Sequence, residues 1–239
     1  QGIDLSFTQK AHKPSGIKAL VGGTLVTMRD ADNTQEVIEN GVVLIEGNRI
    51  KAVGRQGEVD VPASAQVVDI TGKTLIPGLV DAHAHGSQGS SEIIPRQNWR
   101  NYADLAFGVT TVHDPSNDTT EIFAASEMQR SGEILAPRIY STGTILYGAN
   151  WPAYKAIIEE PDDAKFHLQR LKDVGAISVK SYNQPRRDVR QQIVAAGKEL
   201  GIMVVPEGAG RFLYDLTMLV DGHTGLGTRS YHAVCHGSQ

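Results

Sequence analysis

The spacing of hydrophobic residues changes once along this 239-residue chain, at about residue 76. Before that point, apolar and polar residues alternate in short segments separated by turn-forming pairs such as Asn40-Gly41 and Gly47-Asn48. Short alternating segments joined through such pairs are typical of β-hairpins. We therefore expect a polar linker over residues 1–15 and a small, partial antiparallel β-sandwich over residues 16–75, with strands at 18–28, 37–45, 49–53 and 65–70.

After residue 76 the chain repeats one unit, which consists of a helical segment, a glycine and a short apolar strand. Glycine commonly ends helices because it adopts the left-handed backbone conformation without strain. The repeat predicts helices at 99–107, 120–130, 164–174 and 188–200, and strands at 79–80, 109–112, 138–142, 177–182 and 202–205, with a sixth from Val220 to His223. This alternation indicates parallel βα units, which build either a closed barrel or a doubly wound sheet. No Gly-x-Gly-x-x-Gly follows a strand, so a dinucleotide site has no support.

Two histidines follow the first of these strands, in the segment 74–86. Alternate residues of a strand share a face, so His83 and His85 are expected to point the same way. Two neutral imidazoles on one face can hold one divalent metal ion. The alternative is a polar strand end with two solvated histidines.

The segment from Val59 to Gly86 resembles the entry to the amidohydrolase superfamily of metal-dependent hydrolases, in its imidazolonepropionase and prolidase-like branch. Segments 205–208 and 221–225 resemble members that are fused behind a β-propeller. The resemblance implies an α/β fold, in which a β-sandwich composite domain precedes a (β/α)8 TIM barrel, here incomplete and spanning residues 76–226. It also implies a hydrolase acting on carbon–nitrogen bonds other than peptide bonds, with an amide, lactam or peptide-like small-molecule substrate and a metal-activated water.

The same resemblance supplies a metal-ligand set. It assigns His83 and His85 to the first barrel strand, and to Lys180 the role of a carboxylated lysine that bridges two metals. Glu207 stands where most of the family has a histidine, and a carboxylate can replace an imidazole as a ligand. We expect one or two divalent ions, zinc first among them. If the resemblance is set aside, the alternative interpretation of Lys180 is a lysine that extends into solvent from a strand end. The alternative for Glu207 is a solvated loop residue.

Two further histidines are candidates for contact with the substrate or with a metal ligand. His113 precedes Asp114 at the end of the second barrel strand, where a hydrogen bond that merely shapes the Asp-Pro turn is the favoured alternative. His223 lies near the expected end of the sixth strand. The family's ligand there usually comes a few residues later, where this chain has Leu226, Gly227 and Thr228.

The segment from Ile76 to Gln239 is shorter than the about 250 residues of a whole barrel. We therefore expect an N-terminal fragment that lacks the seventh and eighth strands, and with them the aspartate that the family uses as general base. Residues 227–239 lose the pattern. A single G inserted before the codons GAA CAC would turn the family's Glu-His into Gly227-Thr228, so this tail is either out-of-frame translation or an authentic extension.

The amino-acid composition and net charge limit the classes of binding partner that can be expected. Apolar residues make up 40% and charged residues 21% of the chain, with a net charge of −4, so neither nucleic acid nor an anionic membrane is indicated. The single cysteine, Cys235, excludes an intramolecular disulfide and a cysteine-based zinc site. We expect a soluble protein of the cytoplasm or periplasm that starts inside a longer gene product, and a homo-oligomer that covers the open strand edges. A non-catalytic barrel scaffold is the rival function, and an enzyme that uses this half-site alone is a third possibility.

Overall fold

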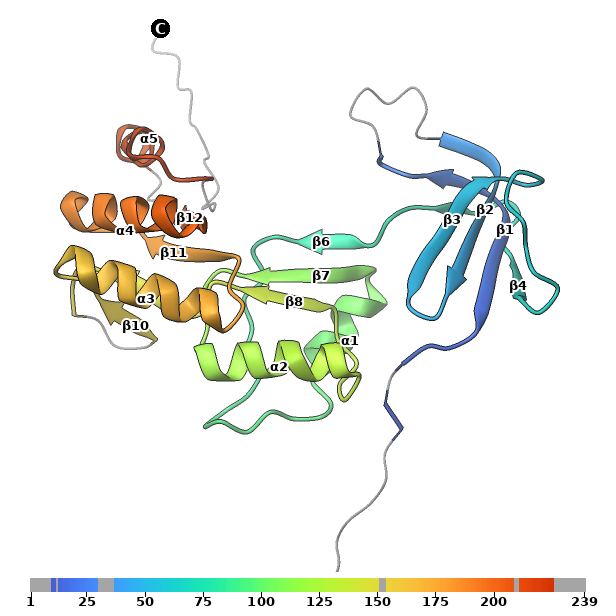
Figure 1. Ribbon diagram of the computed structural model, residues 1–239, viewed down its shortest axis with the longest axis horizontal. Helices are drawn as coiled ribbons and strands as arrows, with labels where there is room; N and C mark the ends of the chain where they lie inside the picture. Colours follow the sequence, from blue (N-terminus) through green and yellow to red (C-terminus); the bar gives the residue numbers. More distant parts are fainter. Residues whose placement is uncertain (1–9, 12, 30–36, 151–153, 209–210, 226–239) are drawn as a thin grey trace, which may run out of the picture. The chain divides into compact units, whose positions relative to one another are not determined.

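The computed structural model describes residues 10–11, 13–29, 37–150, 154–208 and 211–225. The chain divides into two compact units, Gln1–Leu79 and Val80–Gln239, and it is a mixed α/β protein (Figure 1). The tail over residues 227–239 and the first nine residues of the expected linker lie outside the described residues.

The first unit is one five-stranded sheet. Its strands are β1 (Ile17–Val26), β2 (Val37–Glu46), β3 (Arg49–Arg55), β4 (Gln66–Asp69) and β5 (Thr74–Leu75), in the order β3-β2-β1-β4, with β5 also pairing with β1. The hairpins predicted at Asn40-Gly41 and Gly47-Asn48 differ in outcome, because only the second is a turn. Strand β2 continues through Asn40 and Gly41, with a shift of its register against β1 and a φ of 50° at Asn40.

The sequence pattern predicted an antiparallel sheet, but the sheet is mixed. Strands β4 and β5 both run parallel to β1, one after the other along the same edge. The segment between them passes close to Gly23 of β1, where a Cβ atom would meet the Lys73 carbonyl oxygen at 2.9 Å, so this close approach favours glycine. The described residues of this unit form a single layer, and the sandwich stays a prediction.

The second unit contains strand–helix repeats. Its strands pair as β6-β7-β8, β9-β10 and β11-β12, and the pairs β7/β8, β9/β10 and β11/β12 are parallel. The elements are β6 (Leu79–Asp81), α1 (Trp99–Ala106), β7 (Val109–Asp114), α2 (Thr119–Ser131), β8 (Arg138–Ser141), β9 (Ile145–Tyr147), β10 (Lys155–Ile157), α3 (Pro161–Asp173), β11 (Ser178–Tyr182), α4 (Arg187–Leu200), β12 (Met203–Pro206) and α5 (Phe212–Asp221).

Helix termini follow the predicted signals in most places. Asp118 caps α2 by accepting a hydrogen bond from the Glu121 backbone amide, and α2 ends at Gly132 in the left-handed conformation. Helix α3 begins at Pro161 rather than at residue 164. Proline is favoured in the first helical turn, and Glu160 and Asp163 complete a capping box around it.

The predicted sixth strand is wrong. Val220 and Asp221 belong to α5, which ends one residue later at Gly222 with a φ of 100°. The backbone amides of Gly222 and His223 donate to Leu219 and Met218, as in a standard glycine-terminated helix. His223 therefore follows a helix instead of ending a strand.

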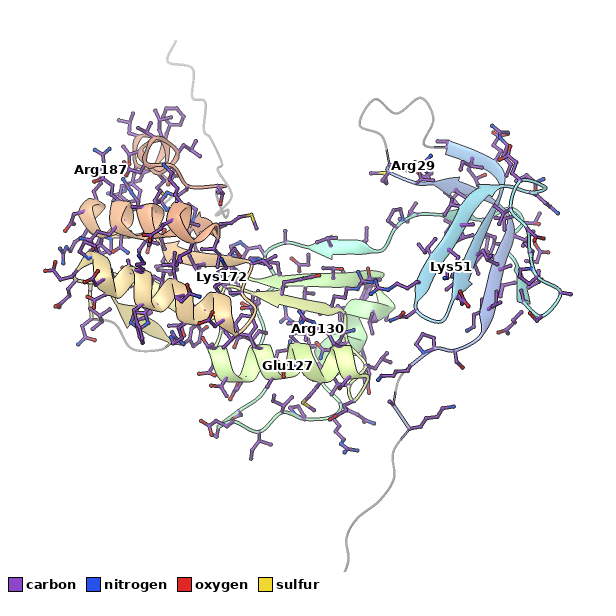
Figure 2. The ribbon with its side chains drawn as sticks, viewed as in Figure 1. Arg29, Lys51, Glu127, Arg130, Lys172 and Arg187 are labelled. Carbon is purple, nitrogen blue, oxygen red and sulfur yellow. The ribbon has the colours of Figure 1, made fainter. Side chains whose placement is uncertain are left out.

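Two apolar clusters hold the second unit together. One packs α3 and α4 on β9, β11 and β12 through fully buried side chains, among them Leu146, Leu168 and Val179. The other packs α2 on β7 and β8, including Ile122 and Ile139. Charged side chains occupy the opposite helix faces, as Glu127, Arg130, Lys172 and Arg187 show in Figure 2.

Within the described segments, none of the helices is both long enough and apolar enough to traverse a lipid bilayer.

Candidate functional site

The histidine pair lies in the turn that follows β6, and not on the strand itself. Strand β6 ends at Asp81, whose carboxylate accepts a hydrogen bond of 3.0 Å from the His83 backbone amide. The Nε2 atoms of His83 and His85 nevertheless approach to 3.1 Å, with the rings edge to face at a centroid distance of 4.9 Å. The Ala84 amide between them donates to the His113 carbonyl oxygen, which ties the turn to β7.

Asp114 lies beside His85. It ends β7 and is 3% exposed, and its Oδ1 lies 3.7 Å from Nδ1 of His85. Burial raises the pKa of Asp114, against hydrogen bonds from the Ser116 amide and the Asn117 side chain that lower it. With Nδ1 facing Asp114, the Nε2 atom of His85 is directed toward His83.

Lys180 and Glu207 meet at the ends of the parallel strands β11 and β12. Lys180 is 1% exposed, the Glu207 side chain 13%, and Nζ lies 2.5 Å from Oε2. This distance makes an ion pair, yet the ammonium donates no hydrogen bond of ordinary geometry among the described residues. Lys180 is thus buried with charge compensation but without directional bonding.

The two pairs act on each other electrostatically. Burial lowers the pKa of His83, the charge of Lys180 and the neighbouring His85 lower it further, and Glu207 raises it. His83 therefore lies close enough to Lys180 and Glu207, at the ends of β11 and β12, for their charges to act on it.

His113 links two strands at this site. Its Nε2 lies 2.8 Å from the Ser178 hydroxyl, which connects β7 to the first residue of β11. Burial lowers the pKa of His113, against a hydrogen bond with the Ala82 backbone that raises it. Contact of His113 with substrate stays a prediction.

His223 lies apart from the other candidates. Its Nε2 is 2.8 Å from the Ser181 hydroxyl and its Nδ1 is 2.8 Å from the Met218 carbonyl oxygen, so both ring nitrogens are engaged. Ser181 neighbours Lys180 on β11, and successive side chains of a strand point to opposite faces. The contacts of His223 join β11 to the end of α5, and a role near the metal stays a prediction.

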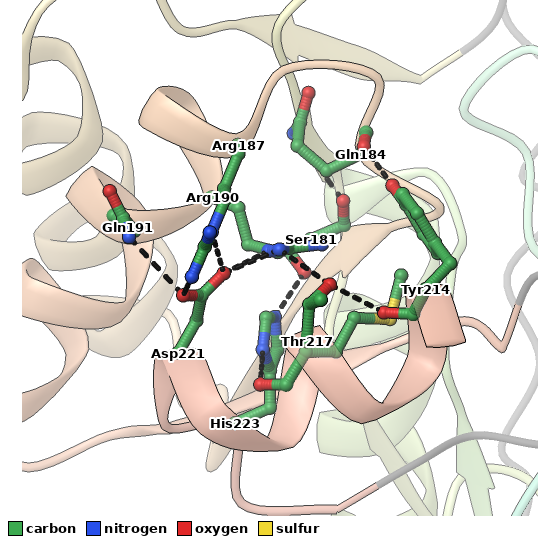
Figure 3. Close-up of polar contacts among 10 residues, drawn as sticks. Ser181, Gln184, Arg187, Arg190, Gln191, Tyr214, Thr217, Asp221 and His223 are labelled. Carbon is green, nitrogen blue, oxygen red and sulfur yellow. Dashed lines mark hydrogen bonds and ion pairs between the residues drawn. The ribbon is translucent and has the colours of Figure 1, made fainter. Parts of the chain in front are cut away.

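An ion network secures α5 on α4 (Figure 3). Asp221 accepts hydrogen bonds from Arg187, Arg190 and Gln191, and the Arg190 guanidinium also donates to the Thr217 hydroxyl at 3.0 Å. Burial raises the pKa of Asp221, but these hydrogen bonds outweigh it and lower the pKa to about 2. Sequence reasoning missed this network. The sequence signal was two arginines three residues apart on α4, which places them on one helix face.

The His83 and His85 nitrogens are spaced as two ligands of one divalent metal ion would be. Nitrogens bound to zinc at about 2.0–2.1 Å in tetrahedral geometry lie about 3.4 Å apart, so the 3.1 Å between the histidine Nε2 atoms suits shared coordination. A lysine ammonium cannot coordinate, and Lys180 fits only after carboxylation makes it an anion. Over the described ranges, no group of three or more histidine, cysteine, aspartate or glutamate side chains is arranged around one ion.

Sequence comparison places this segment among known enzymes. No protein-family model matches the chain. It is 43% identical over 167 residues to an imidazolonepropionase of Bacillus cereus, and 35% identical over 107 residues to one of a Geobacillus strain. These matches cover 66% and 41% of this chain but only 32% and 25% of the relatives, so the chain spans about a third or less of their length.

Solved structures share the fold over more of the chain. A Bifidobacterium longum protein assigned as a prolidase superposes with a TM-score of 0.71 at 22% identity, covering 89% of this chain and 54% of that protein. Phenylurea hydrolase B gives 0.68 at 20% identity, covering 88% and 59%. With the imidazolonepropionase matches, these likenesses lead to one assignment: the chain belongs to the amidohydrolase superfamily.

Proposed function

We propose that this chain carries part of the active site of a metal-dependent hydrolase that cleaves a carbon–nitrogen bond in an amide, lactam or peptide-like small molecule. The proposed frame is an incomplete (β/α)8 barrel preceded by a partial β-sandwich. The relatives named imidazolonepropionase and phenylurea hydrolase support the reaction class. The observation that carries the proposal is the convergence of the His83 and His85 Nε2 atoms beside the buried pair of Lys180 and Glu207.

The proposed ligands are His83, His85, Glu207 and Lys180, with zinc as the preferred ion. When bound, such an ion lowers the pKa of a coordinated water and polarises the substrate carbonyl. Asp114 holds His85 in the ring orientation that presents Nε2. Glu207 holds Lys180 at the strand ends until the lysine, in its deprotonated form, attacks carbon dioxide through Nζ. Proton loss from the resulting carbamic acid leaves an anion.

His113 and His223 are proposed to support this arrangement from outside the ligand set. His113 joins β7 to Ser178, two residues before Lys180. His223 holds Ser181, the residue after Lys180. The general base remains unassigned among these side chains, and the aspartate expected from the superfamily keeps that role. A non-catalytic scaffold is not favoured, because the matched relatives are named as enzymes.

Equilibrium dialysis against zinc tests the metal site. The wild-type chain should bind zinc, and the double variant His83→Ala/His85→Ala should lose that binding because both imidazoles are removed. Asp114→Asn should weaken affinity by about 10–100-fold, the usual effect of removing a group that orients a ligand. The matched control is His167→Ala, a half-buried histidine on α3 away from these strand ends, which should bind like wild type.

The activity arm uses the zinc-loaded chain and an N-acyl amino acid, with release of the free amine as readout. Hydrolysis that disappears in the double histidine variant supports the proposal. Equal zinc uptake by the wild type and the double variant would contradict it.

A further inference from the structure

One buried amide side chain joins three parts of the chain beside the candidate site. Asn117 lies in the loop between β7 and α2 and is 7% exposed. Its Nδ2 donates hydrogen bonds to the Gly86 carbonyl oxygen at 2.9 Å and to Asp114 Oδ2 at 2.7 Å, and its Oδ1 accepts one from the Asp118 backbone amide at 2.8 Å. Both N–H bonds of the amide and its oxygen are therefore engaged.

These three partners require the chemistry of an amide at position 117. Gly86 and Asp114 present acceptors and Asp118 presents a donor, so the side chain must donate twice and accept once. An ionised aspartate has the same shape but only accepts, and it would place a second carboxylate against Asp114. A serine hydroxyl has one proton and cannot serve two acceptors at once. Asparagine satisfies all three partners.

Both acceptors of the Asn117 amide are neighbours of His85, one along the chain and one in space. Gly86 follows His85, so the bond to its carbonyl oxygen restrains the backbone of the turn that carries the ring. Asp114 Oδ1 lies 3.7 Å from Nδ1 of His85, so the bond to this carboxylate restrains the group that the ring faces.

The two oxygens of the buried Asp114 carboxylate have separate donors. Oδ1 accepts from the Ser116 backbone amide at 2.9 Å, and Oδ2 accepts from Asn117. The carboxylate cannot turn about its Cβ–Cγ bond without breaking these bonds, so Oδ1 stays the oxygen nearer to His85. Asn117 supplies the side-chain donor of this pair.

We propose that Asn117 is a positioning residue of the metal site, which orients His85 through the Asp114 carboxylate and through the turn at Gly86. The inference rests on the proposed function and deepens it, since it adds a residue that acts on a ligand only through that ligand's neighbours. The competing explanation is that Asn117 serves folding alone, by shaping the loop before α2.

Zinc affinity of the whole chain separates the two explanations. Asn117→Asp keeps the shape and the acceptor for Asp118 but loses both donated bonds, and equilibrium dialysis should show binding about tenfold weaker than in wild type. The direction of the change is informative, because the added negative charge by itself would strengthen the binding of a cation. The neutral variant Asn117→Ser should weaken binding as well, and it replaces the aspartate variant if that one does not fold.

The matched control is Asn98→Asp. Asn98 also donates from its amide to a carbonyl oxygen of the same loop, that of Ser87 at 3.1 Å, and accepts from the Arg100 backbone amide at the start of α1. This variant loses a comparable bond and gains the same charge without touching Asp114, so it should bind zinc at least as tightly as wild type. Urea unfolding followed by circular dichroism compares the stability of all variants.

A second measurement uses the metal-free chain. Nitrogen-15 NMR at a pH near 8, where imidazoles are mostly neutral, reports which ring nitrogen of a histidine carries the proton. His85 should carry it on Nδ1, which faces Asp114, and the signals are assigned by their loss in His85→Gln. Asn117→Ser should lose this preference, whereas Asn98→Asp should keep it.

The results distinguish failure of the inference from failure of the proposed function. Unchanged zinc affinity in both Asn117 variants, or an equal loss in Asn98→Asp, overturns the positioning role and leaves the metal site intact. Absence of zinc binding by wild type contradicts the proposed function, and the proton position on His85 then decides alone whether Asn117 orients the ring. The same tautomer in wild type and Asn117→Ser would overturn that orientation.

Discussion

Lys180 and Arg190 are the two bulkiest basic side chains buried in the described part of the second unit, and their partners treat them differently. Arg190 faces Asp221, which also accepts hydrogen bonds from Arg187 and Gln191 (Figure 3). Lys180 faces Glu207 alone, at 2.5 Å, and its ammonium lacks a hydrogen bond of ordinary geometry among the described residues. The pair of Arg190 and Asp221 makes further hydrogen bonds with its neighbours, whereas the Lys180 ammonium makes none of ordinary geometry among the described residues.

Under the proposed function, this difference separates a pair that stabilises the fold from a pair that takes part in metal binding. A guanidinium stays charged at any ordinary pH and needs several fixed acceptors when buried, which the end of α5 supplies. A lysine ammonium is a compact point charge on a flexible stem, and a single carboxylate, that of Glu207, pairs with it here. Burial alone does not distinguish the two pairs, whereas the number of hydrogen bonds made by each charged group does.

Removing Asp221 should have the largest effect on stability. Asp221→Ala leaves Arg190 buried without its carboxylate, and breaking a buried pair in this way typically costs about 3–5 kcal/mol. Urea unfolding followed by circular dichroism measures the loss. The double variant Arg190→Met/Asp221→Leu should recover much of it, because apolar side chains of similar volume tolerate the same position. A loss below that of an exposed pair would show that the network is not stabilising.

Acid unfolding sharpens the same prediction. The folded pKa of Asp221, about 2, lies below its ordinary value of 3.8, so its stabilising contribution is complete above the ordinary value. That contribution disappears as the pH falls from 3.8 through about 2. Wild type should lose stability in this window, while Asp221→Asn should lack that component and show a flatter curve.

Breaking the pair of Lys180 and Glu207 should affect stability less and zinc binding more. Lys180→Met and Glu207→Gln should each cost about 1–2 kcal/mol, because Glu207 reaches solvent and a glutamine can still accept from the lysine. The double variant should be more stable than either single variant. All three should bind zinc more weakly than wild type. If they unfold as wild type does and also keep zinc affinity, the pair is neither structural nor part of the metal site.

His223→Asn should have the smallest effect, and that effect should depend on pH. Burial lowers the folded pKa of His223 below its ordinary value of 6.5, so the unfolded chain takes up the proton first as the pH falls. Stability from the neutral ring is complete above 6.5 and declines as the pH falls toward the folded pKa. The variant should lose about 0.5–1 kcal/mol near pH 8, for the missing hydrogen bonds, and less near pH 5. Parallel stability curves for wild type and variant would exclude this titration.

The sequence predicted local structure best where a single residue decides it. Helix α2 begins after Asp118 and ends at Gly132 as expected, because capping depends on side-chain chemistry and on glycine's backbone freedom. Strands β9 and β10 went unpredicted, since three residues are too few to show a period. The strand expected at Val220 failed because Gly222, and not the β-branched valine, determines where α5 ends.

The candidate site likewise contains features that the sequence predicted and features that it did not. His83 and His85 could be paired from their spacing, and their rings do converge although the strand stops before them. The contact between Lys180 and Glu207 depends on the register of β11 against β12, which a local pattern cannot supply. The left-handed backbone of Tyr182 at the end of β11 also went unpredicted, because the residue type gives no signal for it.

The parallel pairing of β11 with β12 also bears on how the chain reaches its fold. Strands β2 and β3 are joined by a turn at Gly47-Asn48, so their ends meet after little chain has been ordered. Strand β11 must wait until the whole of α4 lies between it and β12, and closing that longer loop costs more entropy before any pairing is gained. Lys180 and Glu207 are therefore brought together only once α4 is included in the closed loop. The β2–β3 hairpin needs far less ordered chain than this pair, whereas β4 and β5 join β1 across loops that are longer still.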